Sequence, residues 1–297
     1  MTGESVPFYV HDLSPVIVHI AGPLAIRWYG MAYLSGFIAA WWLLKILARK
    51  KLFALPESEA GNFIMAIGLW GVLVGARVGN ALFYDLRATI EHPLSLFKIW
   101  EGGMASHGGF IGVALTLLWY ARKHRVSVWN LADNLTCVAP LGLLFGRLAN
   151  FINGELWGRV TNVSWAVIFP TEADYPAGTK LPQQTILDLL HSGQLHPRHP
   201  SQLYEAFGEG LLLFTILWIL RHTRASRRPG FISAAFLALY ATIRIACEFF
   251  RDPDGPVYFG WMSKGQLLSL FLYAGAAVVW FVAPRTGNFQ SLEKPRA

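Results

Sequence analysis

The chain has 297 residues, of which 54% are hydrophobic and only 14% are Asp, Glu, Lys or Arg, and its formal net charge is +7. Because an ordinary soluble domain has about 25% charged residues, this composition argues against a soluble enzyme, a coiled coil and a disordered chain. It favours a polytopic membrane protein, in which the excess of bases belongs to the loops and gives no reason to expect nucleic acid as a partner.

Seven apolar segments have about the 20 residues that a helix needs to cross the hydrocarbon layer of a membrane. They are Leu24–Ala48, Asn62–Tyr84, His107–Ala121, Leu131–Ile152, Ser201–Leu220, Phe231–Phe250 and Gly265–Ala283. The sequence therefore predicts an all-α polytopic fold, with transmembrane helices one to four in residues 24–152 and helices five to seven in residues 201–283.

The distribution of Lys and Arg predicts how these helices are oriented. Basic clusters in residues 49–51, 122–125 and 221–228 all follow odd-numbered segments, and the C-terminal tail, residues 284–297, is basic as well. Because such clusters stay on the cytoplasmic side, we expect the tail inside and the N-terminal segment, residues 1–23, outside. The first ten residues contain no Lys or Arg and so lack the basic start of a cleaved signal peptide.

The loop between the fourth and fifth segments, residues 153–200, is long enough to form a small extramembrane head of mixed structure on the outer face. The apolar run Trp165–Phe169 predicts a strand, and Thr185 and Asp188 have the spacing of a capping box at the start of a short helix. The weakly alternating segment Pro15–Gly22 is expected to pair as a strand at the same surface.

Ionisable side chains inside lipid are costly, so each of them needs an explanation. Lys45 lies one turn from a basic cluster and is expected to extend its ammonium group to the cytoplasmic surface. The predicted topology places other ionisable residues toward the outer leaflet, which is more typical of a one-sided site than of a transport path across the membrane. These residues are Arg27, Arg77, His107, Arg147, Arg244 and Glu248.

Two helical segments carry most of this one-sided charge. Tyr240, Arg244 and Glu248 recur every four residues and therefore share one helix face. The alternative for Arg244 and Glu248 is an ion pair that only hides two charges from lipid. Arg147 and Asn150 follow helical spacing near the outer end of the fourth helix, and a simple amphipathic helix end does not explain an arginine at that depth.

The third segment opens with the sequence His107-Gly108-Gly109. Two glycines at this position allow a backbone or a ligand to approach closely, and a helix N-terminus offers amide groups to an anion. The alternative is that His107 is an aromatic anchor at the membrane interface.

Arginines in a poorly hydrated pocket suit a phosphate-bearing lipid headgroup, because a guanidinium group binds phosphate through two hydrogen bonds and stays charged. The sequence has no HExxH motif, Cys/His cluster or GxSxG motif, so we predict neither a metal nor another cofactor. The residues suit displacement of a phosphate leaving group by a nucleophile of a second substrate. A transporter of an anionic lipid or solute, and a lipid-headgroup transferase with a hydroxyl acceptor, remain as alternatives.

Several motifs of the chain resemble the bacterial prolipoprotein diacylglyceryl transferases. Residues 146–158 match the family signature GRxxNFxNxExxG, and further matches are Arg27–Gly30, Met104–Gly109, His199–Glu205 and Tyr240–Arg251. The resemblance implies a seven-helix enzyme of the bacterial cytoplasmic membrane with a periplasmic head. It also implies transfer of the diacylglyceryl group of phosphatidylglycerol to the lipobox cysteine thiol of a prolipoprotein, with a thioether and glycerol 1-phosphate as products.

The resemblance and the chemistry together suggest a role for each candidate site residue. Arg147 and Arg244 are expected to hold the phosphate, and His107 is expected to accept the thiol proton. Glu155 and Glu248 are expected to orient arginines. The residues expected to bind or position the substrates, or to shape the backbone around them, are Tyr29, Gly108, Gly109, Asn150, Gly158 and Tyr240.

Overall fold

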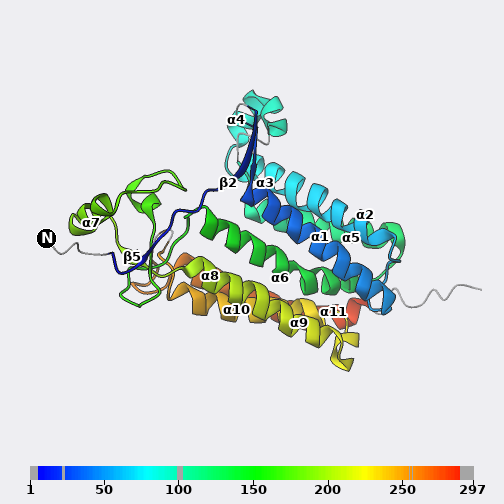
Figure 1. The fold of residues 1–297 in the computed structure, drawn as a ribbon. Helices are drawn as coiled ribbons and strands as arrows, with labels where there is room; N and C mark the ends of the chain where they lie inside the picture. The colour runs from blue at the N-terminus through cyan, green and yellow to red at the C-terminus, as the bar shows by residue number, and fades with distance from the viewer. Residues whose placement is uncertain (1–5, 22–23, 99–102, 254, 256, 288–297) are drawn as a thin grey trace, which may run out of the picture. The chain divides into compact units, whose positions relative to one another are not determined.

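The computed structural model describes residues 6–21, 24–98, 103–253, 255 and 257–287. The chain forms two compact units, whose helices are labelled in Figure 1. Unit 1 comprises residues 1–39, 136–227 and 231–280, and unit 2 comprises residues 40–135, 228–230 and 281–297. Helices α1 (Trp28–Arg49) and α6 (Val128–Ile152) each contribute residues to both units.

Six helical stretches among the described residues are long and apolar enough to cross a membrane, so the chain is a predominantly helical, polytopic membrane protein. Besides α1 and α6 they are α2–η1–α3 (Glu59–Ala66, Ile67–Val74, Gly75–Phe83), α8–η5–α9 (Ser201–Glu205, Ala206–Leu212, Leu213–Arg221), α10 (Phe231–Glu248) and α11 (Lys264–Gly287). The remaining predicted span corresponds to α5 (Ser106–His124), which is not among the six. Short helices α4 (Leu86–Glu91), η2 (Pro93–Phe97) and η6 (Arg224–Arg227) lie in connecting segments.

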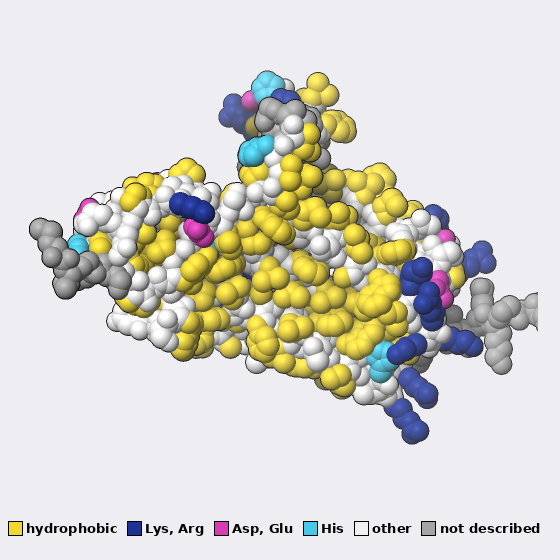
Figure 2. Space-filling model, viewed as in Figure 1, with side chains coloured by type: hydrophobic (Ala, Val, Ile, Leu, Met, Phe, Trp, Pro, Cys, Tyr) yellow, Lys and Arg dark blue, Asp and Glu magenta, His cyan; other side chains and the backbone are white. Residues whose placement is uncertain are grey.

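The outward faces of the long helices are apolar. Large hydrophobic side chains such as those of Trp42, Ile219 and Phe271 are 60% exposed or more. Hydrophobic side chains cover most of the helical surface that is seen in Figure 2. A continuous apolar surface of this extent is compatible with lipid as the surrounding medium and not with water.

Helix α1 begins later than the sequence predicts. Leu24–Arg27 form strand β3, which pairs antiparallel with β2 (Val16–Ala21), and the helix starts at Trp28. The strand expected near residue 16 is therefore present, but its partner is the adjacent segment of a hairpin. Arg27, which we expected inside the first span, is the last residue of β3 and lies outside the helix.

Residues 153–200, which we call the insert, form a small mixed subdomain together with residues from the N-terminal segment. Strand β1 (Tyr9–Val10) pairs parallel with β4 (Val167–Ile168), and β4 pairs antiparallel with β5 (Pro197–Arg198). The subdomain has its own buried core of Ile168, Ile186 and Leu195. Figure 1 shows the insert beyond the ends of α8 and α10, within unit 1.

The predicted elements of the insert are present with one correction. Strand β4 falls within the predicted strand, and α7 (Gln183–His191) is the predicted short helix, preceded by the short helix η4 (Pro170–Ala173). The predicted capping box is wrong, because the N-cap is Pro182 and Thr185 lies inside the helix. Asp188 accepts a hydrogen bond from Gln184 Nε2 at 2.9 Å instead.

Candidate active site

Two arginines from different helices meet inside unit 1. Arg147 of α6 lies with Nη1 2.8 Å from Glu205 Oε2 and donates from Nη2 to Glu209 Oε2 at 3.2 Å. Arg244 of α10 donates from Nη1 to Glu205 Oε1 at 3.1 Å and to Glu209 Oε1 at 3.2 Å. Each carboxylate therefore binds both arginines, with one oxygen facing each. We call these four residues the arginine–glutamate cluster.

Two further ion pairs extend the cluster. Arg244 Nη2 lies 2.9 Å from Glu248 Oε2, one turn later on α10, as the four-residue spacing predicted. The other oxygen of Glu248 accepts a hydrogen bond from Ser263 Oγ at 2.8 Å. Arg251 donates from Nη1 to Glu205 Oε1 at 3.1 Å, so that Glu205 binds three arginines in all.

The carboxylates of the cluster lie deeper than its guanidinium groups. The side chains of Glu205 and Glu209 are 0% exposed, whereas those of Arg147 and Arg244 are 17% and 14% exposed. Together with Glu248 and Arg251, the cluster contains equal numbers of arginines and glutamates. This balance is needed because an unpaired charge is costly in an interior of low dielectric constant. Of the four residues of the cluster, only the two arginines therefore retain side-chain exposure.

Three of the predicted site residues form a second group, around Asn150 of α6. The Asn150 side chain is buried and donates from Nδ2 to the Tyr29 hydroxyl at 3.1 Å and to Glu155 Oε1 at 2.8 Å. Glu155 was expected to orient an arginine, but its hydrogen-bond partners are Asn150 and, at 3.4 Å, Asn153. Glu155 therefore accepts hydrogen bonds from these two side-chain amides instead.

Tyr240 lies one turn before Arg244 on α10. Its ring stacks on that of Phe236, with centroids 5.9 Å apart and planes 11° apart. It packs beside the buried apolar residues Leu213 and Leu217 of α9. The ring is therefore fixed between the apolar core and the cluster.

Gly158 connects the insert to the segment that follows α10. Its amide donates to His199 O at 2.9 Å, and it forms a bridge with Arg251. A Cβ at this position would lie 2.6 Å from His199 O, so no side chain fits there. Gly158 thus has the backbone role that was expected of it, and it ties the insert to Arg251 and through it to Glu205.

An ion-pair group inside the insert strengthens the same connection. Arg198 donates to Glu172 Oε1 at 2.7 Å and to Asp252 Oδ2 at 3.0 Å, and its guanidinium group lies 4.4 Å from the centroid of the Trp157 ring. Burial opposes ionisation of Glu172, but hydrogen bonds from Arg198 and His196 outweigh it and lower the pKa of the carboxyl group. The ionised form of Glu172 therefore stabilises the insert.

His107, Gly108 and Gly109 belong to α5 in unit 2 and are not part of the arginine–glutamate cluster. The sequence suggested that a backbone or a ligand could approach these glycines closely, and the structure shows a backbone. A Cβ on Gly108 would lie 3.1 Å from Gly79 N of α3. The Gly109 amide is not free, because it donates to Ala105 O at 3.1 Å. His107 itself is exposed at the start of the helix.

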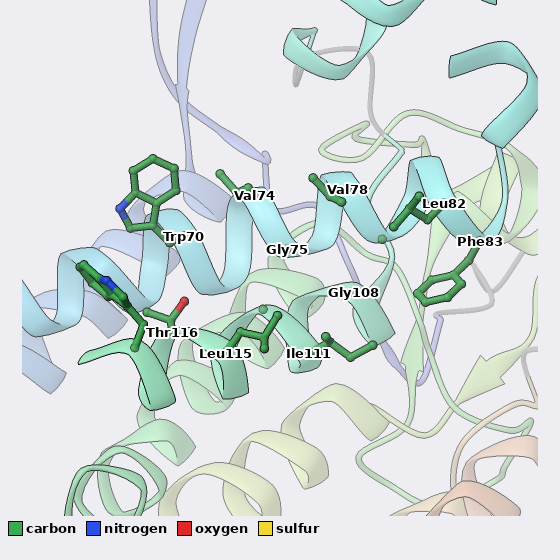
Figure 3. Close-up of a pocket in the computed structure, with 13 residues that line it drawn as sticks. Trp70, Val74, Gly75, Val78, Leu82, Phe83, Gly108, Ile111, Leu115 and Thr116 are labelled. Atoms are coloured by element: carbon green, nitrogen blue, oxygen red, sulfur yellow. The ribbon is translucent and has the colours of Figure 1, made fainter. Parts of the chain in front are cut away.

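An apolar groove follows this contact between α5 and the η1–α3 helix. It has a volume of about 490 Å³, and among the described residues that line it only Thr116 has a polar side chain, apart from the indole groups of two tryptophans. Figure 3 shows Val78 and Ile111 among the side chains that line it, with Trp70 near one end and Phe83 near the other. Gly108, the residue after His107, is among the residues that line it.

The sequence interpretation missed the central carboxylates of the cluster. Glu205 entered it only as the last residue of the motif His199–Glu205, and Glu209 was not noticed. The signal was available, because both residues lie in one apolar segment, four residues apart, as Tyr240, Arg244 and Glu248 do.

Comparison with known proteins gives a match over residues 15–282 to the family described as prolipoprotein diacylglyceryl transferase. The chain is similar to proteins named phosphatidylglycerol–prolipoprotein diacylglyceryl transferase from three bacteria. The protein of Allorhizobium ampelinum is 42% identical over 94% of this chain and 93% of its own length. The protein of Bradyrhizobium diazoefficiens is 40% identical over 98% of this chain and 99% of its own length. The protein of Xylella fastidiosa is 39% identical over 97% of this chain and 98% of its own length.

Proposed function

The chain belongs to the prolipoprotein diacylglyceryl transferase family, and on that premise we propose that its arginine–glutamate cluster holds the phosphate of phosphatidylglycerol during the reaction. The enzyme transfers the diacylglyceryl group of this lipid to a prolipoprotein, a step of lipoprotein maturation, in the bacterial inner membrane. The observation that carries the proposal is that Arg147 and Arg244 meet on two shared carboxylates and that their side chains, unlike those carboxylates, are partly exposed.

The acceptor in this proposal is the thiol of the lipobox cysteine in the prolipoprotein signal peptide. The sulfur forms a bond to the terminal glycerol carbon of the diacylglyceryl group as the bond from that carbon to the phosphate oxygen breaks. The thiol proton passes to a base, and glycerol 1-phosphate leaves with the electron pair of the broken bond. No covalent intermediate with the enzyme is required.

The two guanidinium groups act on the leaving group. Charge accumulates on the phosphate as the carbon–oxygen bond breaks, and fixed cationic donors in a water-poor site stabilise that charge without reorganising. Arg147 and Arg244 supply such donors, and their partners already hold them in place. Asn150, Tyr29 and Tyr240 position the headgroup or the peptide, and Glu248 orients Arg244.

We keep His107 as the base. A free thiol with a pKa near 8.5 is only a few per cent ionised at pH 7, so a nearby imidazole raises the reactive thiolate fraction. His107 is exposed at the start of α5 and is therefore accessible to a substrate. The groove between α5 and η1–α3 suits an acyl chain of the lipid, because its lining is almost entirely apolar and includes Gly108, the residue after His107.

The finer topology also belongs to the proposal. We infer that α5 crosses the membrane as a seventh helix, since it packs against η1–α3 along its length and carries Arg122, Lys123 and His124 in its last turn. Bases at this end fit a cytoplasmic helix end. The N-terminus and the insert then lie on the periplasmic side and the C-terminus in the cytoplasm.

The direct test is transfer of labelled diacylglyceryl from phosphatidylglycerol to synthetic lipobox peptides by the purified protein. A cysteine peptide is compared with the same peptide carrying serine. We expect a labelled product and release of glycerol 1-phosphate with cysteine only. Equal labelling of the serine peptide would show that the enzyme accepts a hydroxyl acceptor as well as a thiol. Movement of intact lipid across the membrane without a labelled product would favour a transporter.

A further inference from the structure

We propose that Glu209 is a positioning residue that sets the spacing of the Arg147 and Arg244 guanidinium groups and limits how tightly they bind phosphate before the reaction. The inference rests on the proposed role of these two arginines. It adds a residue that the sequence patterns had not indicated, and its basis is the geometry of one buried carboxylate.

Glu209 contacts both arginines through its two carboxylate oxygens. Its Oε2 accepts hydrogen bonds from Arg147 Nε at 3.3 Å and Nη2 at 3.2 Å, and its Oε1 accepts one from Arg244 Nη1 at 3.2 Å. Within the described part of the chain its side chain has no other recorded polar partner, whereas Glu205 also binds Arg251. Because the two oxygens of a carboxylate are a fixed distance apart, Glu209 holds the two guanidinium groups at a fixed separation.

The backbone around Glu209 is built for close approach to both arginine helices. Glu209 lies in the π-helical stretch η5, and such stretches are frequent at functional sites. A Cβ on Gly208 would lie 2.7 Å from Ile243 Cγ2, next to Arg244, and a Cβ on Gly210 would lie 2.6 Å from Leu144 Cβ, one turn before Arg147. The two flanking glycines therefore let η5 touch α10 and α6 at once, with Glu209 between them.

The charge of Glu209 has a second consequence. Its removal leaves one guanidinium charge without its partner in a nearly closed site, and this excess charge attracts a phosphate more strongly in the ground state. Tighter ground-state binding does not accelerate a reaction, and loss of alignment slows it. A neutral residue at this position should therefore lower turnover without weakening lipid binding.

The test is Glu209→Gln, which keeps the shape of the side chain and removes its charge. For transfer from phosphatidylglycerol to a lipobox cysteine peptide, we expect kcat to fall at least about tenfold while KM for the lipid stays unchanged or falls. Inhibition by the product glycerol 1-phosphate should become stronger. A kcat within about threefold of the parent chain, or a rise in KM, would overturn the proposal.

Two further variants separate charge, geometry and folding. Glu209→Asp keeps the charge but is too short to reach both arginines, so we expect a lower kcat with no fall in KM and no stronger product inhibition. If Glu209→Gln does not yield folded protein, Glu209→Asp becomes the deciding variant, and a kcat equal to that of the parent chain would overturn the proposal. The control is Glu57→Gln, which removes an exposed partner of Arg49 far from the cluster in the sequence. It should leave kcat and KM unchanged.

The same assay keeps this inference distinct from the proposed function. If the parent chain did not label the cysteine peptide, the proposed function would fail. If the parent chain were active and Glu209→Gln matched it, only the role of Glu209 would be lost.

Discussion

Arg147 of α6 and Arg244 of α10 are 97 positions apart in the chain and are both bound by the carboxylates of Glu205 and Glu209. Each arginine also keeps a small exposed fraction, while the carboxylates are fully buried. This arrangement differs from a simple ion pair that hides charge from lipid, because two helices each contribute an arginine to the same two carboxylates.

Replacement of either arginine by lysine should nearly abolish transfer. A lysine ammonium group cannot donate in a planar fork to two carboxylates and a phosphate together. We expect kcat/KM to fall about a hundredfold to a thousandfold for Arg147→Lys and for Arg244→Lys. Arg49→Lys, at an exposed ion pair with Glu57, is the matched control and should retain activity. Near-normal turnover of both cluster variants would rule out a role for the guanidinium fork.

Replacement of His107 by glutamine tests the base. If the imidazole accepts the thiol proton, turnover at neutral pH should fall about a hundredfold or more, and the loss should shrink as rising pH ionises the thiol directly. The measurement is the pH–rate profile of the variant against that of the parent chain. Turnover close to normal at neutral pH would require another base.

Replacement of Gly158 by alanine should weaken the connection between the insert and Arg251. An added methyl group meets His199 O, and we expect a destabilisation of about 1–3 kcal/mol with loss of activity. Gly142→Ala is the control, since its new methyl group would have no described atom within 4 Å outside its own stretch of helix, and alanine is the better helix former. Thermal unfolding of both purified variants in one detergent checks the prediction.

The insert should lose stability in acid because of Glu172. Its pKa is lower in the folded protein than its ordinary value of 4.5, so its stabilising effect is complete above that value and is lost as the pH falls through the lowered pKa. Hydrogen exchange of residues 167–198 at several pH values measures this. Glu172→Gln should raise exchange at neutral pH and remove the acid-dependent step, and an unchanged pH dependence would contradict the assignment.

The groove between η1–α3 and α5 should contact the acyl chain of the substrate. A phosphatidylglycerol with a photoreactive group in its acyl chain should label the peptides that contain Ile111 and Leu115. The control surface is the equally exposed apolar face of α11 around Val278 and Phe281. Leu115→Trp, which fills the groove, should raise KM for the lipid several-fold. Equal labelling of the groove and of the α11 surface would show that the groove contacts lipid no more specifically than any other exposed apolar surface.

The membrane character of the chain and the pairing of Arg244 with Glu248 were predictable from the sequence. The first follows from composition and the second from helical periodicity, and both depend only on neighbouring residues. The short helix and the strand of the insert were also predicted, because apolar runs between prolines are local signals. The start of α1 was placed too early, since an apolar run does not reveal that Leu24–Arg27 pair with β2 in a hairpin.

Helical spacing and the cost of charge in lipid were enough to make Arg147 and Arg244 candidates for one phosphate site. Their partners became visible only with the packed helices: Glu205 and Glu209 join the two arginines, Glu155 binds Asn150, and Gly108 faces a helix backbone. These contacts could not be predicted because periodicity describes one helix at a time. The partner of a buried charge depends on which helices pack together and how closely their glycines let them approach.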